Sequence, residues 1–330
     1  MQKRVLGRTG RMVSVVGLGT WQLGADWGEV SDADARAVLE ASLEAGVTFY
    51  DTADVYGDGR SEQTVGAFLA DHRDEGLTVA TKMGRRADQV PENYVLENFR
   101  SWTDRSRANL GVDTLDLVQL HCPPTPVYSR DEVYDALDTL VDEGAMASYG
   151  VSVETVDEAL TAIARPGVAT VQIILNAFRH KPLEKVLPAA SEAGVGIIAR
   201  VPLASGLLSG RYTKDTTFAE NDHRTFNRGG EAFDVGETFS GVPFDVGVEA
   251  AASFTELAEG LEQDLTPAQA AIAWIWQSPG VSTVIPGART PEQARLNAAA
   301  GEAGSLGPLF ASRVRDLYDS SIREHVHDRW

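Results

Sequence analysis

Residues 47–62, VTFYDTADVYGDGRSE, contain the unit that decides the fold. The segment begins with a short apolar run, VTFYD (47–51), whose β-branched and aromatic residues favour a strand. Gly57 and Gly59 then allow a turn, and Ser61 and Glu62 suit the first turn of a helix. Because residues 60–71 follow a helical period, the stretch predicts a strand that leads directly into a helix.

The same unit recurs along the chain. Strands are predicted at 13–19, 47–51, 77–82, 115–121, 148–153, 170–175, 195–200 and 281–285. Helices are predicted at 32–45, 60–71, 92–110, 130–143, 154–164, 183–193, 267–277 and 290–300. Eight strands, each followed by a helix, indicate an α/β protein with a closed (β/α)8 TIM barrel, and residues 1–330 are expected to form one domain. A doubly wound sheet is the alternative, but GLGTWQLG (17–24) matches its glycine-rich fingerprint poorly.

Three segments depart from the alternation of strands and helices. Residues 1–14 predict an N-terminal β-hairpin with a turn at Thr9 and Gly10. A long polar and aromatic insertion at 211–247 follows the seventh strand, and its five phenylalanines favour a lid over a flexible linker. Residues 301–330 form a C-terminal extension beyond the eighth helix.

Composition narrows the class of protein. The chain has 330 residues, of which 43% are hydrophobic, enough for a substantial core. Its 29 basic and 48 acidic residues give a net charge of −19, which argues against binding to nucleic acids or anionic membranes. The N-terminus lacks the apolar core of a signal peptide, and no long uncharged run suits a membrane span, so a cytoplasmic protein is expected. The single cysteine, Cys122, excludes an intramolecular disulfide.

Four reactive side chains lie at or just beyond the ends of three consecutive predicted strands. Asp51 ends the second strand, Tyr56 follows it, Lys82 ends the third and His121 ends the fourth. Taken singly, such residues are more often solvated groups, caps or structural groups. In a barrel, however, the carboxyl ends of the strands converge on one face. Asp51 would then pair with Lys82, and the Lys82 ammonium would lower the pKa of the Tyr56 phenol toward a value useful for an acid catalyst.

A resemblance to a known family rests on several motifs that occur in its order and spacing. They are GVTFYDTADVYGDGRSE (46–62), ATKMG (80–84), LDLVQLH (115–121), YGVS (149–152) and VIPGA (284–288). The sequence resembles the aldo-keto reductase family from about residue 4 to residue 300. The resemblance implies that Tyr56 is the general acid, that Lys82 and Asp51 tune it, and that His121 orients the carbonyl oxygen.

The same resemblance implies an NADPH-dependent reduction of aldehydes or ketones by hydride transfer from nicotinamide C4, with Tyr56 as proton donor. Within it the sequence looks closest to bacterial reductases of varied aldehydes and of sugar-like or inositol-related compounds. No metal is expected, because the sequence has no HExxH motif and no compact cluster of His and carboxylate ligands. Cys122 is expected to be a packing residue, since strand alternation would point it away from His121.

Cofactor contacts are also implied by the resemblance. They are Thr20, Trp21, Asp51, Ser152, Gln172, Arg200, Pro202, Leu203, Ser205, Gly206, Arg211, Gly287, Ala288, Arg289, Gln293 and Asn297. Arg289 is the candidate for the 2′-phosphate of NADPH, beside a helix N-terminus. The chain departs from the family at two positions: Val153 stands where many members have Asn, and Arg200 where an aromatic ring often stacks on the nicotinamide. Arg200 could stack in its place, or pair with an acid or a phosphate.

Substrate contacts are expected from Trp21, Tyr56, His121 and Phe178, with Trp102 and the insertion as further candidates. Two other functions remain open. One is an NADPH-binding regulatory or sensory subunit, as in relatives associated with potassium channels. The other is a Schiff-base aldolase in which Lys82 attacks a carbonyl, although pairing with Asp51 would keep Lys82 protonated and poorly nucleophilic.

Overall fold

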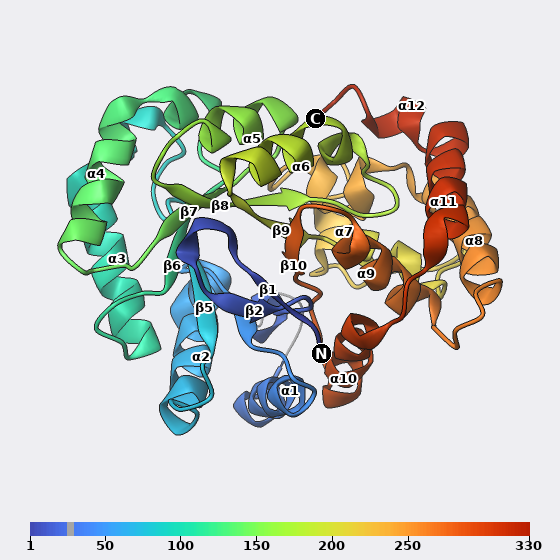
Figure 1. Ribbon diagram of the computed structural model, residues 1–330, viewed down its shortest axis with the longest axis horizontal. Coiled ribbons are helices and arrows are strands. Elements are labelled where there is room, and N and C mark those ends of the chain that lie inside the picture. Colours follow the sequence, from blue (N-terminus) through green and yellow to red (C-terminus); the bar gives the residue numbers. More distant parts are fainter. Residues whose placement is uncertain (25–29) are drawn as a thin grey trace.

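Eight parallel strands follow one another in chain order around one sheet of the computed structural model, which describes residues 1–24 and 30–330 (Figure 1). The strands are β3 (Leu18–Gly19), β4 (Phe49–Asp51), β5 (Thr78–Met83), β6 (Leu117–His121), β7 (Tyr149–Ser152), β8 (Val168–Ile174), β9 (Gly196–Arg200) and β10 (Val281–Val284). Parallel bridges from Val16 to Val284 and from Gly19 to Gly287 join the two ends of the sheet. The predicted (β/α)8 barrel is therefore confirmed.

Helices cover the outside of the barrel (Figure 1). They are α1 (Asp32–Glu44), α2 (Arg60–Asp71), α3 (Leu96–Leu110), α4 (Asp131–Asp142), α5 (Val156–Ile163), α6 (Lys181–Ala193), α9 (Pro267–Gln277) and α10 (Pro291–Ala299). Several begin at side-chain caps: Ser31 accepts a hydrogen bond from the Asp34 N–H, and Thr155 and Thr266 form capping boxes. Among the described residues, no helix is long and apolar enough to cross a membrane.

The N-terminal hairpin closes the bottom of the barrel. Strand β1 (Lys3–Val5) pairs antiparallel with β2 (Met12–Ser14), as predicted, and Gly10 turns the chain with a φ of 68°. Leu6 and Val13 of this hairpin are fully buried, and they form an apolar cluster with inward-facing strand residues. The other members of the cluster are Phe49, Ala80, Leu117, Ile198 and Ile285. The hairpin thus fills the end of the barrel opposite the active-site face.

The structure corrects three predicted boundaries. The expected first strand at 13–19 is divided: residues 12–14 belong to the hairpin, and only Leu18 and Gly19 form β3 in the barrel. The helix expected at 92–110 begins at Leu96, because Val95 is extended and a 3-10 turn occupies Pro91–Asn93. Helix α8 (Phe244–Glu259) lies largely where no element is expected, although its buried positions follow a helical period.

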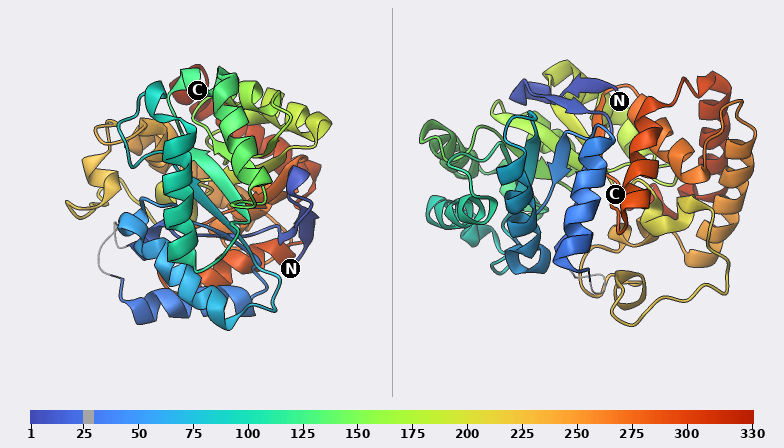
Figure 2. Two further views of the ribbon diagram at one scale, coloured as in Figure 1. Left: turned by 90° about the vertical axis from the view of Figure 1, so that its left-hand side faces the viewer. Right: turned by 90° about the horizontal axis from the view of Figure 1, so that it is seen from below.

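The insertion and the C-terminal extension are both folded. The insertion contains the short helix α7 (His223–Phe226), and the extension forms α11 (Gly307–Ser321) and α12 (Arg323–Val326). Within the insertion, the ring of Phe239 lies 5.8 Å from Phe218 and 5.0 Å from Phe244 between centroids. Figure 2 shows the insertion at the opposite end of the barrel from the hairpin.

We expect Leu6→Ala to lower the free energy of unfolding by about 2–5 kcal/mol, because it leaves a cavity in the plug of the barrel. Urea denaturation would measure this change. Val5→Ala is the matched control, since Val5 is 52% exposed and its truncation should change stability little. Equal losses in the two variants would contradict a plugging role for Leu6.

Candidate active site

A buried ion pair between Lys82 and Asp51 lies at the base of the site, where β5 runs beside β4. The two side chains are only 1% and 3% exposed. Lys82 also donates a hydrogen bond to the carbonyl oxygen of Thr52 at 2.8 Å. Asp51 accepts hydrogen bonds from the amides of Gln172 at 2.7 Å and Gln119 at 3.2 Å. Burial opposes charge on Lys82, but attraction to Asp51 and Tyr56 and hydrogen bonds to both together outweigh it and raise the pKa of Lys82.

Tyr56 lies beside this pair, as predicted from the strand ends. Its hydroxyl oxygen is 3.4 Å from Lys82 Nζ. The expectation of a lowered phenol pKa is wrong for this structure: burial raises the pKa of Tyr56, the Lys82 ammonium offsets only part of that rise, and Asp51 adds to it. Tyr56 therefore carries its proton at neutral pH.

His121 faces Tyr56 from the next strand, β6. Their ring centroids are 5.8 Å apart, with an interplanar angle of 84°. Burial, and then the positive charges of Arg85, Lys82 and Arg200, hold the pKa of His121 well below its ordinary value. The His121 imidazole is thus neutral. Its buried Nδ1 has no hydrogen-bond partner within residues 1–24 and 30–330, which leaves it available to a ligand.

A pocket with a volume of about 630 Å³ opens above these residues. Its wall includes Asp51 and Tyr56 together with every predicted cofactor residue except Ser152 and Ala288. The lining residues among the predictions are Thr20, Trp21, Asp51, Gln172, Arg200, Pro202, Leu203, Ser205, Gly206, Arg211, Gly287, Arg289, Gln293 and Asn297. Ser152 and Ala288 are buried behind the wall, with 1% and 2% of their surfaces exposed.

The loop before α10 forms one wall of the pocket. Arg289 donates its backbone N–H to Gln293 Oε1 at 2.8 Å, and Asn297 Nδ2 donates to the Gly287 carbonyl at 3.1 Å. The side chain of Arg289 is exposed and makes no ion pair with another described residue. A cation at a helix N-terminus suits a phosphate ligand.

Arg200 is held by acids, which is one of the two roles that the sequence left open. It forms ion pairs with Glu154 at 2.9 Å and with Glu237 at 2.8 Å. It also donates to the carbonyl oxygen of Val153 at 3.0 Å. Val153 thus supplies its backbone to the site, and Arg200 is fixed in the pocket wall.

Sequence reasoning expected the insertion to contribute to the site, but Arg211 was the one residue of it that was named. Glu237, His223 and Arg224 all line the pocket, although they lie far along the chain from the strand ends. Burial favours the neutral form of Glu237, but Arg200 and Arg85 outweigh it and lower its pKa. Pairing with Arg200 therefore keeps Glu237 charged. The five phenylalanines of the insertion indicated that this segment is folded. No sequence motif indicated that Glu237 would line the pocket.

Trp21 lies between Tyr56 and the insertion. Its ring stacks near Tyr56, with centroids 5.9 Å apart, and meets Phe233 of the insertion edge-on at 5.7 Å. Phe178, by contrast, is fully buried and does not line the pocket. Trp102 packs against Phe99 inside the helical layer. Of the predicted substrate contacts, Trp21 and Tyr56 line the pocket. His121, Phe178 and Trp102 do not.

Cys122 does not point away from the site as expected. It follows the last residue of β6 with a φ of 46°, which breaks the alternation of the strand. Its Sγ lies 3.3 Å from the Ser152 hydroxyl, and burial raises the pKa of the thiol to about 12. In the described part of the chain, Cys122, Glu154 and Glu237 bring potential metal ligands within 4.8 Å of one another. The Arg200 guanidinium already pairs with both carboxylates, so a cation would have to compete with it.

Comparison with known proteins agrees with this geometry. A model of the aldo/keto reductase family matches residues 15–319. A probable voltage-gated potassium channel subunit beta from Oryza sativa subsp. japonica is 33% identical, over 98% of this chain and 97% of that protein. Aldo-keto reductase AKR11C1 from Bacillus halodurans, in its holo form, is 27% identical with a TM-score of 0.76, over 96% of each chain. Glycerol dehydrogenase AKR11B4 from Gluconobacter oxydans is 28% identical with a TM-score of 0.77, over 98% of this chain and 95% of that one.

The barrel and these matches define an NAD(P)H-dependent oxidoreductase. The protein belongs to the aldo/keto reductase family. The resemblance identified in the sequence is therefore confirmed.

The neutral state of His121 predicts a pH dependence of stability. In the unfolded chain the imidazole takes up a proton as the pH falls below its ordinary pKa of 6.5, whereas the folded protein keeps it neutral. The unfolded state then binds more protons, so acid destabilises the fold. Below pH 6.5 the parent should lose about 1.4 kcal/mol per pH unit more than His121→Gln. Urea unfolding at several pH values measures both slopes, and parallel slopes would contradict a neutral His121.

Proposed function

We propose that the protein reduces aldehydes or ketones to alcohols with NADPH as cofactor and Tyr56 as proton donor. The observation that carries the proposal is the convergence of Tyr56, Lys82, Asp51 and His121, of which Asp51 and Tyr56 line one pocket. When bound, a reduced nicotinamide supplies a hydride to the carbonyl carbon. The residues of the chain then have to orient the carbonyl oxygen and provide a proton to it.

The pocket fits such a dinucleotide. Tyr56 marks its catalytic end, and the unpartnered Nδ1 of buried His121 belongs to the ring next to Tyr56, where a carbonyl oxygen could be oriented. Arg211, Arg224 and Arg289 line the pocket of a chain whose net charge is −19, which is a local reversal of charge that favours phosphate groups. We therefore assign Arg289 to the 2′-phosphate of NADPH, and Ser205, Gly206 and Arg211 to the neighbouring phosphates.

Each catalytic side chain has a defined part in the proposed proton transfer. Tyr56 holds a proton at neutral pH because burial raises its pKa. Lys82 lies 3.4 Å from the phenol oxygen, so its charge stabilises the phenolate that remains after the proton leaves. Asp51 fixes the direction of Lys82, and neutral His121 can donate a hydrogen bond to the substrate oxygen. The buried, paired and protonated state of Lys82 speaks against the Schiff-base alternative.

A regulatory role is the second candidate, because the chain is 33% identical to a protein named as a potassium channel subunit beta. In that role the pocket would bind NADPH to control a partner. An NADPH oxidation screen over a panel of aldehydes separates the two functions: turnover supports the reductase, and tight NADPH binding without turnover supports the regulatory subunit.

Tyr56→Phe should reduce the rate of carbonyl reduction by about 10²–10⁴, the range expected when a general acid is removed. NADPH affinity should change little, since the ring that stacks near Trp21 remains. Single-turnover NADPH oxidation and a fluorescence titration measure the two quantities. Tyr94→Phe is the control, because its hydroxyl bonds Gln89 outside the pocket. Undiminished reduction by Tyr56→Phe would exclude this residue as the proton donor.

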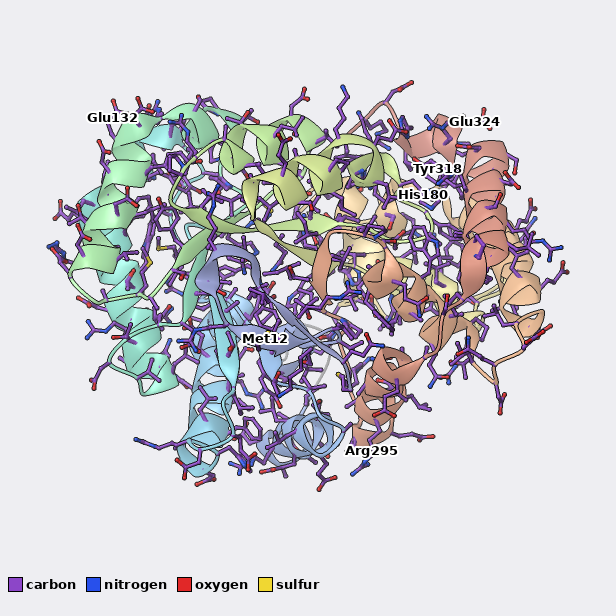
Figure 3. The ribbon with its side chains drawn as sticks, viewed as in Figure 1. Met12, Glu132, His180, Arg295, Tyr318 and Glu324 are labelled. Atoms are coloured by element: carbon purple, nitrogen blue, oxygen red, sulfur yellow. The ribbon has the colours of Figure 1, made fainter. Side chains whose placement is uncertain are left out.

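Arg289→Ala should weaken NADPH binding by about 10-fold or more and leave NADH binding nearly unchanged, because only NADPH carries the 2′-phosphate. Titration with both cofactors gives the ratio of affinities. Arg295→Ala is the matched control: Arg295 lies on α10, the helix that begins just after Arg289 (Figure 3). Its side chain is 55% exposed and pairs with Glu44. An unchanged ratio in Arg289→Ala would remove Arg289 from phosphate recognition.

A further inference from the structure

The C-terminal extension is fastened to the barrel by stacked aromatic rings. Tyr318 of α11 lies parallel to His180, with ring centroids 4.1 Å apart and an interplanar angle of 13° (Figure 3). The Tyr318 hydroxyl and His327 Nδ1 share a hydrogen bond of 2.9 Å. The chain from α11 to residue 330 is thus held in one place beside the barrel.

At residue 330 the extension meets the insertion. The indole Nε1 of Trp330 donates to Asp234 Oδ1 at 2.9 Å, and the Gly236 N–H donates to the same oxygen at 2.7 Å. Two glycines make room for the indole: a methyl group on Gly241 would lie 2.3 Å from it, and one on Gly236 would lie 3.1 Å from it. Trp330 is accordingly buried, with 7% of its surface exposed.

The indole of Trp330 also covers a buried cation of the barrel. The guanidinium of Arg179, from the loop after β8, lies 3.5 Å from the centroid of the Trp330 ring. Arg179 is 2% exposed, and within the described residues its side-chain nitrogens have no hydrogen-bond partner. Burial lowers the pKa of Arg179 to about 9, and the charges of Glu154 and Asp234 oppose that effect. The face of the Trp330 ring is therefore a principal contact of the buried Arg179 guanidinium.

The segment that Trp330 contacts leads directly into the active site. Asp234 and Gly236 belong to the turn that ends at Glu237. Glu237 lines the pocket and pairs with Arg200, and its carbonyl oxygen accepts a hydrogen bond from Ser205 at 3.1 Å. A shift of this turn would move Glu237 away from Arg200.

We propose that Trp330 is a positioning residue, which latches the insertion to Arg179 and so holds Glu237 against Arg200 in the wall of the cofactor pocket. The latch itself follows from contacts within the chain. Its effect on NADPH rests on the proposed function.

The test compares Trp330→Ala and Trp330→Phe with the parent. Phe310→Ala is the matched control, because Phe310 is a buried aromatic of the same extension that packs on Phe254. Limited trypsin digestion without ligand reports opening of the insertion through cleavage at Lys214 and Arg228, which are both exposed. Titration and steady-state kinetics give the NADPH Kd, kcat and KM.

In Trp330→Ala, cleavage at these two sites should be about 10-fold faster, the change expected from loss of a desolvated cation–π contact and a hydrogen bond. The NADPH Kd should rise by a similar factor, with a smaller change in kcat. Trp330→Phe retains the ring face and should recover part of both effects. Phe310→Ala should lower Tm without selective cleavage of the insertion.

Insertion cleavage in Trp330→Ala no faster than in Phe310→Ala at matched global stability would overturn the latch. An NADPH Kd equal to that of the parent despite faster cleavage would overturn the positioning of the cofactor pocket by Trp330. If the parent itself binds no NADPH, the proposed function fails, and the digestion of the apo chain still decides whether Trp330 holds the insertion.

Discussion

The ion pair between Lys82 and Asp51 is the constraint on which the site depends. Both groups are withdrawn from water, and a buried pair is tolerated only when its remaining polar atoms are satisfied. Asp51 meets this condition through Gln119 and Gln172, and Lys82 through the Thr52 carbonyl. The ion pair belongs to β4 and β5, and its partners come from β6, β8 and the residue after β4, so the interior of the barrel must close correctly before the charges are compensated.

The ion pair also acts on the protonation of the two rings beside it, Tyr56 and His121. The cation that stabilises the phenolate form of Tyr56 also repels a proton from His121, which burial and Arg85 already disfavour. Tyr56 is thus the group that carries a transferable proton, and His121 is a neutral hydrogen-bonding group. Burial therefore favours the neutral form of both groups, and the Lys82 ammonium opposes that effect only at Tyr56. In the proposed function, this suits transfer of a single proton from Tyr56 to a carbonyl oxygen.

The sequence predicts the position of a site residue well when that position depends on the nearby chain alone. It predicts the position poorly when a distant segment has to fold back onto the barrel. Strand ends are local, so Asp51, Lys82 and His121 could be placed on one face from periodicity and barrel geometry alone. Glu237 could not, because its position depends on how a long insertion folds back over the barrel. The predicted direction of the Cys122 side chain was wrong for a different reason. That prediction assumed that side chains alternate along a strand, and the φ of 46° at Cys122 breaks this alternation. The direction of the pKa shift of Tyr56 also required the structure, since burial and charge oppose each other there.

Arg200 is a buried cation in the wall of the pocket, and it is held by two carboxylates. Removing either carboxylate partner would leave a buried guanidinium partly uncompensated, and breaking such a pair typically costs about 3–5 kcal/mol. Arg200 is therefore unlike exposed Arg289, whose charge is available to a ligand. Arg200, which is already paired with acids, shapes the pocket. Arg289, which is exposed to solvent, is suited to select the anion that enters the pocket. Because one of the acids that hold Arg200 belongs to the insertion, the shape of the wall depends on where that segment is fastened.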